Sequence, residues 1–168
     1  QSSADAAVSN ARGMTLCEGS FEWCGDATTP CAEFAVGNSG AGKTHIAPGL
    51  GLAECQKGLS VGFTTAAALV HELIEARDER RLFYMQKRLA NLKLLIIDEL
   101  GFVPLSKTGA ELLFEVFSQR YERGSVLVTS NLPFDEWTEV LGSERLTGAL
   151  LDRLTHHVDI LEMNGDSF

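Results

Sequence analysis

The residues with the clearest chemical signature lie between positions 37 and 44, where the chain reads G-N-S-G-A-G-K-T. This run fits the pattern G-x-x-x-x-G-K-[ST], in which glycines let successive backbone N–H groups surround a phosphate without side-chain obstruction. In such loops the lysine reaches the outer phosphates of a nucleotide, and the hydroxyl after it ligates Mg²⁺. The pattern predicts a nucleotide site rather than a chance glycine-rich turn, and its residues are Gly37, Asn38, Ser39, Gly40, Ala41, Gly42, Lys43 and Thr44.

Two adjacent acids follow a strongly apolar run, L-L-I-I, and are Asp98 and Glu99. The run predicts a buried strand whose C-terminal end carries both acids, where α/β sheets place their ligands. Asp98 suits a water-mediated hold on Mg²⁺, and Glu99 suits the base that orients an attacking water. A strand that ends in two solvated acids would look the same, but the phosphate-loop pattern upstream favours the hydrolytic interpretation. The base-reading motif N-K-x-D of GTPases is absent.

Two further polar residues have an open interpretation. Asn131 comes directly after the apolar run 125–130, where its amide could contact both a γ-phosphate and the attacking water, but a turn-forming asparagine before Leu-Pro explains it more simply. Arg153 flanks a stripe of leucines, and the pattern fits a snorkelling arginine paired with Asp152 as well as a catalytic one. His156 and His157 are adjacent on a predicted strand entry, so their side chains point apart and we expect no shared metal.

From residue 32 onward, apolar runs alternate with helical patterns, which predicts a parallel sheet covered by helices. The predicted strands are residues 32–36, 60–64, 92–98, 125–130 and 157–162. Besides the helix after the phosphate loop, helices are predicted over residues 64–82, 108–124, 135–142 and 143–157.

Local signals refine the predicted helix ends. Thr108 and Glu111 have the spacing of a capping box, Asp135 is a predicted N-cap, and Gly142 is a predicted stop signal. Pro48, placed near the end of the first turn after the phosphate loop, is expected to weaken its helix.

Composition and charge restrict the partners. The 168-residue chain carries a net charge of −9, so it has no general electrostatic attraction for nucleic acid. DNA binding would need a local basic patch or an assembly that aligns cations from several subunits. The only basic cluster lies within residues 80–88, and a solvated helix face is the favoured interpretation of it. Its members are Arg80, Arg81, Lys87 and Arg88, beside Phe83 and Tyr84.

Other features of the chain are less informative. No run of 18 apolar residues and no signal-peptide pattern occurs, so we expect a cytoplasmic protein without a membrane partner. The four cysteines lack the spacing of zinc ligands and are expected to be reduced thiols. Residues 1–31 show no sustained periodicity and are expected to be a poorly ordered or remnant segment.

Several stretches together resemble one family. They are GNSGAGKTH, FTTAAALVHELIEA, LLIIDELGFVPLSKTGAELLFEV, SQRYERGS, VTSNLPFDEWTEV, RLTGALLDRLTHH and ILEMNGDS. Between about Val36 and Phe168 the chain resembles the IstB-like transposase helper ATPases, which are relatives of the DnaC-type helicase loaders within the AAA+ superfamily.

The resemblance implies an α/β fold: a P-loop NTPase three-layer sandwich with a five-stranded parallel sheet, formed by residues 32–168 as an AAA+ core without a C-terminal lid domain. It implies ATP and Mg²⁺ as cofactors, with residues 37–44 as Walker A and with Asp98 and Glu99 as Walker B. Asn131 matches sensor 1. Arg153 matches the arginine finger, which would act on ATP held by a neighbouring subunit.

The function that the resemblance implies is ATP-driven assembly on double-stranded DNA and recruitment or activation of a transposase. A helicase loader with the same core is the nearest alternative, because the ATPase residues do not separate the two. A truncated nucleotide-binding module without turnover is a third interpretation. It is favoured by Pro48 and by residues 1–31, which do not look like the family's partner-binding region, whereas Glu99, Asn131 and Arg153 disfavour it. A small-molecule phosphotransferase is the most distant, since no acceptor-binding segment or lid is visible.

Overall fold

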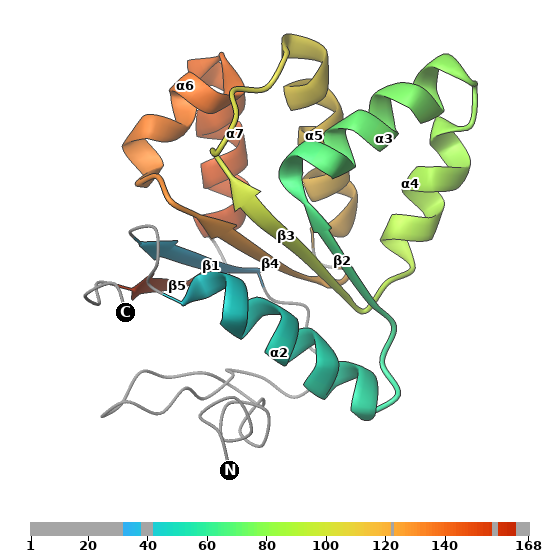
Figure 1. Ribbon diagram of the computed structural model, residues 1–168. Coiled ribbons are helices and arrows are strands. Elements are labelled where there is room, and N and C mark those ends of the chain that lie inside the picture. The colour runs from blue at the N-terminus through green and yellow to red at the C-terminus, as the bar shows by residue number, and fades with distance from the viewer. Residues whose placement is uncertain (1–31, 38–41, 122, 156–157, 164–168) are drawn as a thin grey trace.

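The structure is a computed structural model that describes residues 32–37, 42–121, 123–155 and 158–163. Residues 1–31, and with them the expected poorly ordered segment and three of the cysteines, lie outside the described part, as do His156 and His157. Strands and helices alternate along the described chain (Figure 1). The elements are β1 (Ala32–Gly37), α2 (Lys43–Gln56), β2 (Val61–Thr65), α3 (Ala66–Asp78), α4 (Leu82–Ala90), β3 (Leu94–Leu100), α5 (Lys107–Arg120), β4 (Ser125–Ser130), a 3₁₀ turn η1 (Phe134–Glu136), α6 (Trp137–Leu141), α7 (Glu144–Thr155) and β5 (Val158–Met163).

The strands form a single parallel sheet in the order β2-β3-β4-β1-β5. The five-stranded parallel sheet predicted from the sequence is therefore confirmed, and each strand lies within two residues of its predicted bounds. The buried runs of β3 and β4 are apolar on both faces, as expected of strands covered by helices on each side. β1 lies between β4 and β5 although it comes first in the chain, so the phosphate-loop pattern follows an interior strand.

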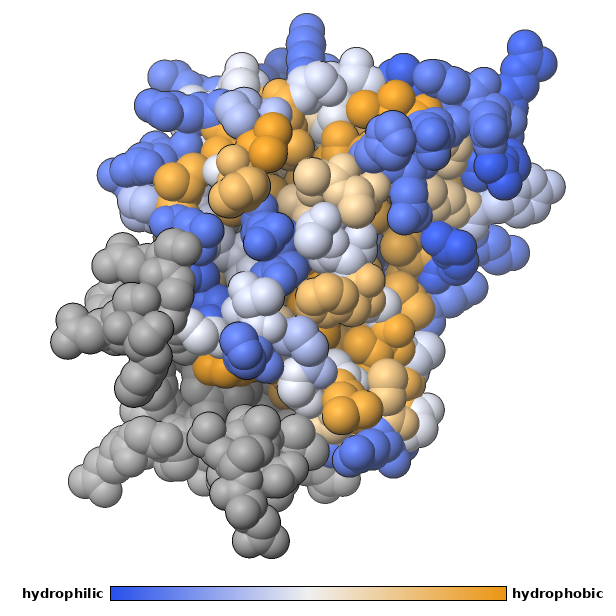
Figure 2. Space-filling view, viewed as in Figure 1, coloured by the Kyte–Doolittle hydropathy of each residue, from blue (hydrophilic) through white to orange (hydrophobic). Residues whose placement is uncertain are grey.

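One face of the sheet is covered by α2, as Figure 1 shows. Its small core contains Ala47, Leu50 and Ala53 from the helix, packed on Leu94, Ile96 and Leu127 from the strands. Two large apolar side chains near this core remain exposed: Leu52 of α2 at 56% and Phe63 of the edge strand β2 at 49%. Hydrophobic surface is accordingly visible over the region of α2 and β2 in Figure 2.

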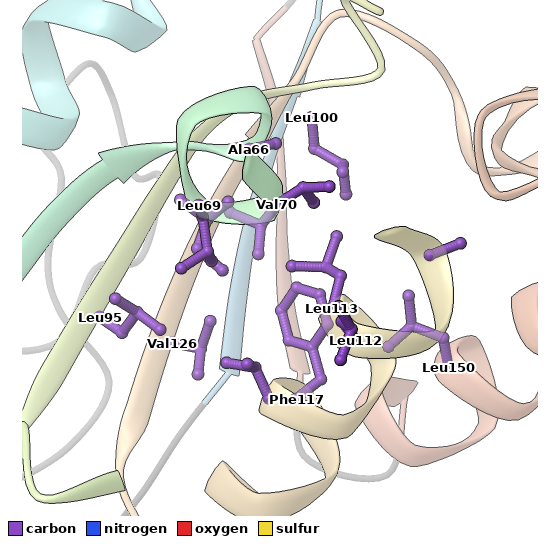
Figure 3. Close-up of a cluster of buried hydrophobic side chains, with 14 of the residues drawn as sticks. Ala66, Leu69, Val70, Leu95, Leu100, Leu112, Leu113, Phe117, Val126 and Leu150 are labelled. Carbon is purple, nitrogen blue, oxygen red and sulfur yellow. The ribbon is translucent and has the colours of Figure 1, made fainter. Parts of the chain in front are cut away.

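The opposite face carries α3 to α7 and the larger core (Figure 1). In Figure 3, Leu69 and Val70 from α3 lie near Leu113 and Phe117 from α5, over strand residues such as Leu95 and Val126. Three aromatic rings also pack together on this face. The ring centroid of Phe34 of β1 lies 5.6 Å from that of Phe134 and 5.2 Å from that of Trp137. Helices on both faces confirm the predicted three-layer sandwich.

The helix predicted over residues 64–82 is wrong at its C-terminal end, because it stops at Asp78 and a separate α4 begins at Leu82. Arg80 interrupts it with φ 59°, a left-handed conformation that a residue with a side chain rarely adopts. The Arg81 N–H donates to the Ala76 carbonyl oxygen at 2.7 Å, which closes the end of α3. The reversal places the exposed rings of Phe83 and Tyr84 on a helix that packs against α3 and α5.

Two predicted helix caps are also wrong. α5 starts at Lys107, and its cap is Ser106, whose hydroxyl accepts from the Gly109 N–H at 3.1 Å, so Thr108 is inside the helix and forms no capping box. Asp135 lies in the η1 turn before α6 and does not cap it. The stop at Gly142 is confirmed, with φ 65°.

Pro48 lies farther into its helix than predicted, in the second turn of α2 rather than the first. A proline here cannot donate a hydrogen bond to the Thr44 carbonyl oxygen four residues earlier. The helix nevertheless continues to Gln56, with Pro48 exposed and Ala47 and Leu50 buried beside it. Packing of this apolar side therefore offsets the missing bond.

Arg120 stabilises the edge of the sheet at which β3 and β4 begin. It is 1% exposed, and its guanidinium donates to the Leu89 carbonyl oxygen, to the Leu92 carbonyl oxygen at 3.1 Å and to the Ser125 carbonyl oxygen at 2.7 Å. Burial lowers the pKa of Arg120 to about 10, so the group stays charged at neutral pH. One side chain thus ties together the end of α4 and the segments that enter β3 and β4.

Replacing Arg120 by methionine should lower the free energy of unfolding by about 3 kcal/mol, because a side chain of similar length would leave three main-chain carbonyls without their donor. Chemical denaturation of the two proteins measures this difference. Arg123→Met, at an exposed position three residues away, is the matched control and should change stability by less than about 0.5 kcal/mol. Equal stabilities of the two variants would show that Arg120 does not fasten this edge.

Within the part of the chain that the structure describes, none of the helices is both long and apolar enough to cross a membrane.

Candidate nucleotide site

The C-terminal edge of the sheet gathers the predicted site residues. β1, β3 and β4 are adjacent and parallel, so their carboxyl ends meet at one edge. The register places Ser130 of β4 beside Val36 of β1 and beside Leu100 of β3. Gly37, the Asp98–Glu99 pair and Asn131 are therefore brought together from three separate stretches of the chain.

Lys43 is the first residue of α2, and the chain enters this helix through Gly42 in a left-handed conformation with φ 87°. The Lys43 Nζ donates to the Gly37 carbonyl oxygen at 2.6 Å, so the side chain reaches back across the segment that joins β1 to α2. The side chain is buried, and this burial lowers the pKa of Lys43, while the nearby negative charge of Asp98 raises it. A cation is thus held where the phosphate-loop pattern requires one.

Residues 38–41 of the predicted phosphate loop lie outside the described residues. Their two flanks are described: Gly37 ends β1, and Gly42 is the N-cap residue just before α2. Thr44 is exposed in the first turn of α2, next to the buried Lys43. The strand and the helix that the phosphate-binding chemistry needs on the two sides of this segment are both present.

Asp98 and Glu99 have different environments although they are adjacent. The Asp98 side chain is 2% exposed, whereas Glu99 is exposed. Between Ile97 and Leu100 the pairing of β3 with β4 shifts in register, and Glu99 has φ 60°, a left-handed conformation that is uncommon outside glycine. Such irregularities bend a strand and turn its side chains in new directions, and they are frequent beside active sites. The end of β3 therefore buries one acid and presents the other.

Thr129 on β4 links both acids, and sequence reasoning missed it. Its hydroxyl donates to Asp98 Oδ1 and accepts from the Glu99 N–H at 3.0 Å. In the sequence, Thr129 appears only as a hydroxyl residue near the end of the apolar run V-L-V-T-S. This position does not indicate which groups the hydroxyl would contact.

Asn131 follows β4 and is half-buried. The residue before it fixes the turn: the Ser130 hydroxyl donates to the Leu100 carbonyl oxygen at 2.6 Å and accepts from the Leu132 N–H at 3.1 Å. These two bonds hold the chain on both sides of Asn131 against the end of β3. The Trp137 Nε1 also donates to the Leu132 carbonyl oxygen at 3.2 Å.

Arg153 lies in the last turn of α7, a helix that packs against α5 and α6. Its side chain lies outside the described part of the structure. Its assignment as an arginine finger stays a prediction.

The described donors fit Mg²⁺ held together with a nucleotide. Oxygen from a hydroxyl and from a carboxylate is what this cation prefers, and Thr44 and Asp98 offer one of each. Among the described residues, no three His, Cys, Asp or Glu side chains come together as a metal-binding group. With Thr44 and Asp98 as ligands, phosphate oxygens and water would have to complete the coordination of the metal.

The fold and the arrangement of this edge define a P-loop nucleotide-binding core. Residues 32–168 match the family model described as IstB-like ATP binding protein, and the chain belongs to that family. It is 38% identical over 133 residues to the ATP-binding protein of insertion sequence IS232 from Bacillus thuringiensis subsp. berliner, covering 79% of this chain and 53% of that protein. It is 42% identical over 132 residues to an insertion sequence ATP-binding protein of Sinorhizobium fredii, covering 79% of this chain and 44% of that one.

The chain spans about half the length of these relatives. Among solved structures, the DnaC helicase loader superposes with a TM-score of 0.69 at 22% identity, covering 83% of this chain and 81% of the loader. A likeness at this level of identity concerns the fold, and it agrees with the sheet order and the layers described above.

Proposed function

We propose that the protein hydrolyses ATP with Mg²⁺ and, assembled on double-stranded DNA through neighbouring ATPase domains, recruits or activates a transposase. The observation that carries the proposal is the meeting of Lys43, Asp98, Glu99 and Asn131 at one sheet edge in a chain of the IstB-like ATP-binding family. The two insertion-sequence relatives named above are 38% and 42% identical, against 22% for the helicase loader, and this favours the transposition helper over the loader.

The roles follow from the position of each side chain. Lys43 would exchange its bond to the Gly37 carbonyl oxygen for the outer phosphates, and the Thr44 hydroxyl and the Asp98 carboxylate would hold Mg²⁺. Glu99 would orient a water and accept its proton, with the Asn131 amide as the second contact to that water. When bound, Mg²⁺ neutralises charge on the phosphates. Residues 37–44 would bind the phosphates of ATP. Arg153 would act as the arginine finger on ATP held by a neighbouring subunit.

Contact with DNA would fall to the basic cluster of residues 80–88, which lies on α4 and just before it. Phe83 and Tyr84 are 70% and 73% exposed, and their ring centroids lie 5.8 Å apart. Arg81 pairs with Glu79 and Arg88 with Glu72, so part of the positive charge is neutralised within the chain. The end of the molecule that carries α3 and α4 is largely hydrophilic in Figure 2. One such cluster in each subunit of an assembly would line up along the DNA backbone and compensate for the acidic chain.

The experiment that tests the shared site mixes two inactive proteins. Arg153→Ala should lose ATP turnover, and so should Lys43→Ala. If each site takes its arginine from a neighbour, an equal mixture on duplex DNA should regain part of the activity, because an intact pocket then faces an intact arginine. Turnover is followed by phosphate release.

Arg145→Ala, an exposed position on the same helix, is the matched control and should keep wild-type turnover. A mixture as inactive as its two components would rule out an arginine contributed by a neighbouring subunit.

A further inference from the structure

We infer that Thr129 is the positioning residue of this site: its hydroxyl fixes the Asp98 carboxylate and the Glu99 backbone at the same time. The inference rests on the proposed function, because it assigns Thr129 to the residues that would hold Mg²⁺ and orient water. Thr129 itself touches neither, and it acts through the two acids.

The first support is how the hydroxyl uses its bonding capacity. A threonine hydroxyl has one donor and two acceptor sites. Thr129 gives its donor to Asp98 Oδ1 and accepts from the Glu99 N–H at 3.0 Å. The donor bond orients the carboxylate and leaves Asp98 Oδ2 for other partners. No valine in the same strand position could make either bond.

The second support is burial. Thr129 is 2% exposed and Asp98 is also 2% exposed, so water has little access to either group. A hydrogen bond between buried groups is expensive to remove, since the partner left behind has no solvent to replace it. Rotation of the Asp98 carboxylate is therefore limited by Thr129.

The third support is the irregular end of β3. The register shift between Ile97 and Leu100 takes Glu99 out of the regular ladder with β4, and the Glu99 N–H is satisfied by the Thr129 side chain instead. Glu99 has φ 60°, and such a conformation persists only where its surroundings impose it. Thr129 is thus part of what keeps Glu99 turned out of the sheet while Asp98 stays inside.

The test compares Thr129→Val, which keeps the shape of the side chain, with Thr129→Ser, which keeps the hydroxyl. ATP affinity is measured with Mg²⁺ and with EDTA, and turnover is measured for kcat and KM. Mutation of a residue that hydrogen-bonds a metal ligand typically lowers metal affinity or activity by ten- to a hundredfold. For Thr129→Val we therefore expect the gain in ATP affinity that Mg²⁺ provides to fall about tenfold, kcat to fall at least about tenfold, and affinity in EDTA to be unchanged.

Thr129→Ser should stay within about threefold of wild type in the Mg²⁺-dependent affinity and in kcat, because it restores both bonds. The matched control is Thr147→Val. Thr147 is also a buried threonine, at 4% exposure, and its hydroxyl donates to the Ser143 carbonyl oxygen at 2.9 Å within α7, so this change should leave both readouts unaltered.

The inference is overturned if Thr129→Val keeps the Mg²⁺-dependent affinity and kcat, if Thr129→Ser fails as Thr129→Val does, or if affinity in EDTA falls equally. If Thr129→Val does not fold, Thr129→Cys replaces it. Its thiol is a weaker donor of similar size, so wild-type behaviour of that variant also overturns the assignment. If the wild-type protein binds ATP with the same affinity in Mg²⁺ and in EDTA, that result contradicts the proposed function itself.

Discussion

Replacing Glu99 by glutamine should stop ATP turnover while ATP remains bound. The substitution keeps the size of the side chain and removes the carboxylate that would accept a proton from the attacking water. General-base catalysis contributes about 10²- to 10⁴-fold, so kcat should fall by at least about a hundredfold. Glu99 is exposed and makes its described hydrogen bond through its backbone N–H, so the fold should be unaffected.

The measurement pairs phosphate release with equilibrium binding of ATP. Glu111→Gln, an exposed glutamate on α5, is the matched control and should hydrolyse ATP at the wild-type rate. Hydrolysis by Glu99→Gln at a rate close to wild type would remove Glu99 as the base.

Replacing Lys43 by alanine should remove nucleotide binding. The Lys43 ammonium lies at the entry of α2, and bonds to charged groups contribute up to about 3 kcal/mol, which corresponds to about a hundredfold in affinity. Alanine is a good helix former at this first helical position, so the protein should fold.

Calorimetric titration with ATP measures the affinity, and thermal unfolding gives an independent readout, because a ligand that binds only the folded state raises the midpoint. ATP should raise the midpoint of the wild type and of Lys107→Ala, an exposed lysine that opens α5, and leave that of Lys43→Ala unchanged. Equal ATP affinities for Lys43→Ala and wild type would refute the assignment of the phosphate loop.

The sheet could be predicted because its signal is local and strong. The runs that became β3 and β4 are buried on both faces, which requires nearly continuous apolar residues, and such runs stand out in any window of the sequence. The helix ends were harder. Ser106 caps α5 instead of Thr108. Arg80 adopts a left-handed conformation, which could not be predicted because arginine has no preference for it.

The candidate site was predictable in its parts and not in its connections. Asp98 and Glu99 lie at the end of β3, Asn131 directly follows β4, and Lys43 opens the helix that follows β1. A parallel sheet brings its strand ends together whatever the details of packing. Thr129 and Arg120 were missed because their importance lies in partners about 30 residues away. A threonine in a strand and an arginine at the end of a helix are ordinary in sequence, and only the fold shows that their polar groups are buried.

The most direct test of the account is ATP turnover measured against protein concentration, with and without duplex DNA, with Glu99→Gln as the blank. The account predicts that turnover per molecule rises with protein concentration and rises further with duplex DNA, because each site would be completed by a neighbouring subunit assembled on the DNA. ATP binding without turnover in any of these conditions would contradict it, and would mean that this chain holds the nucleotide and does not use it.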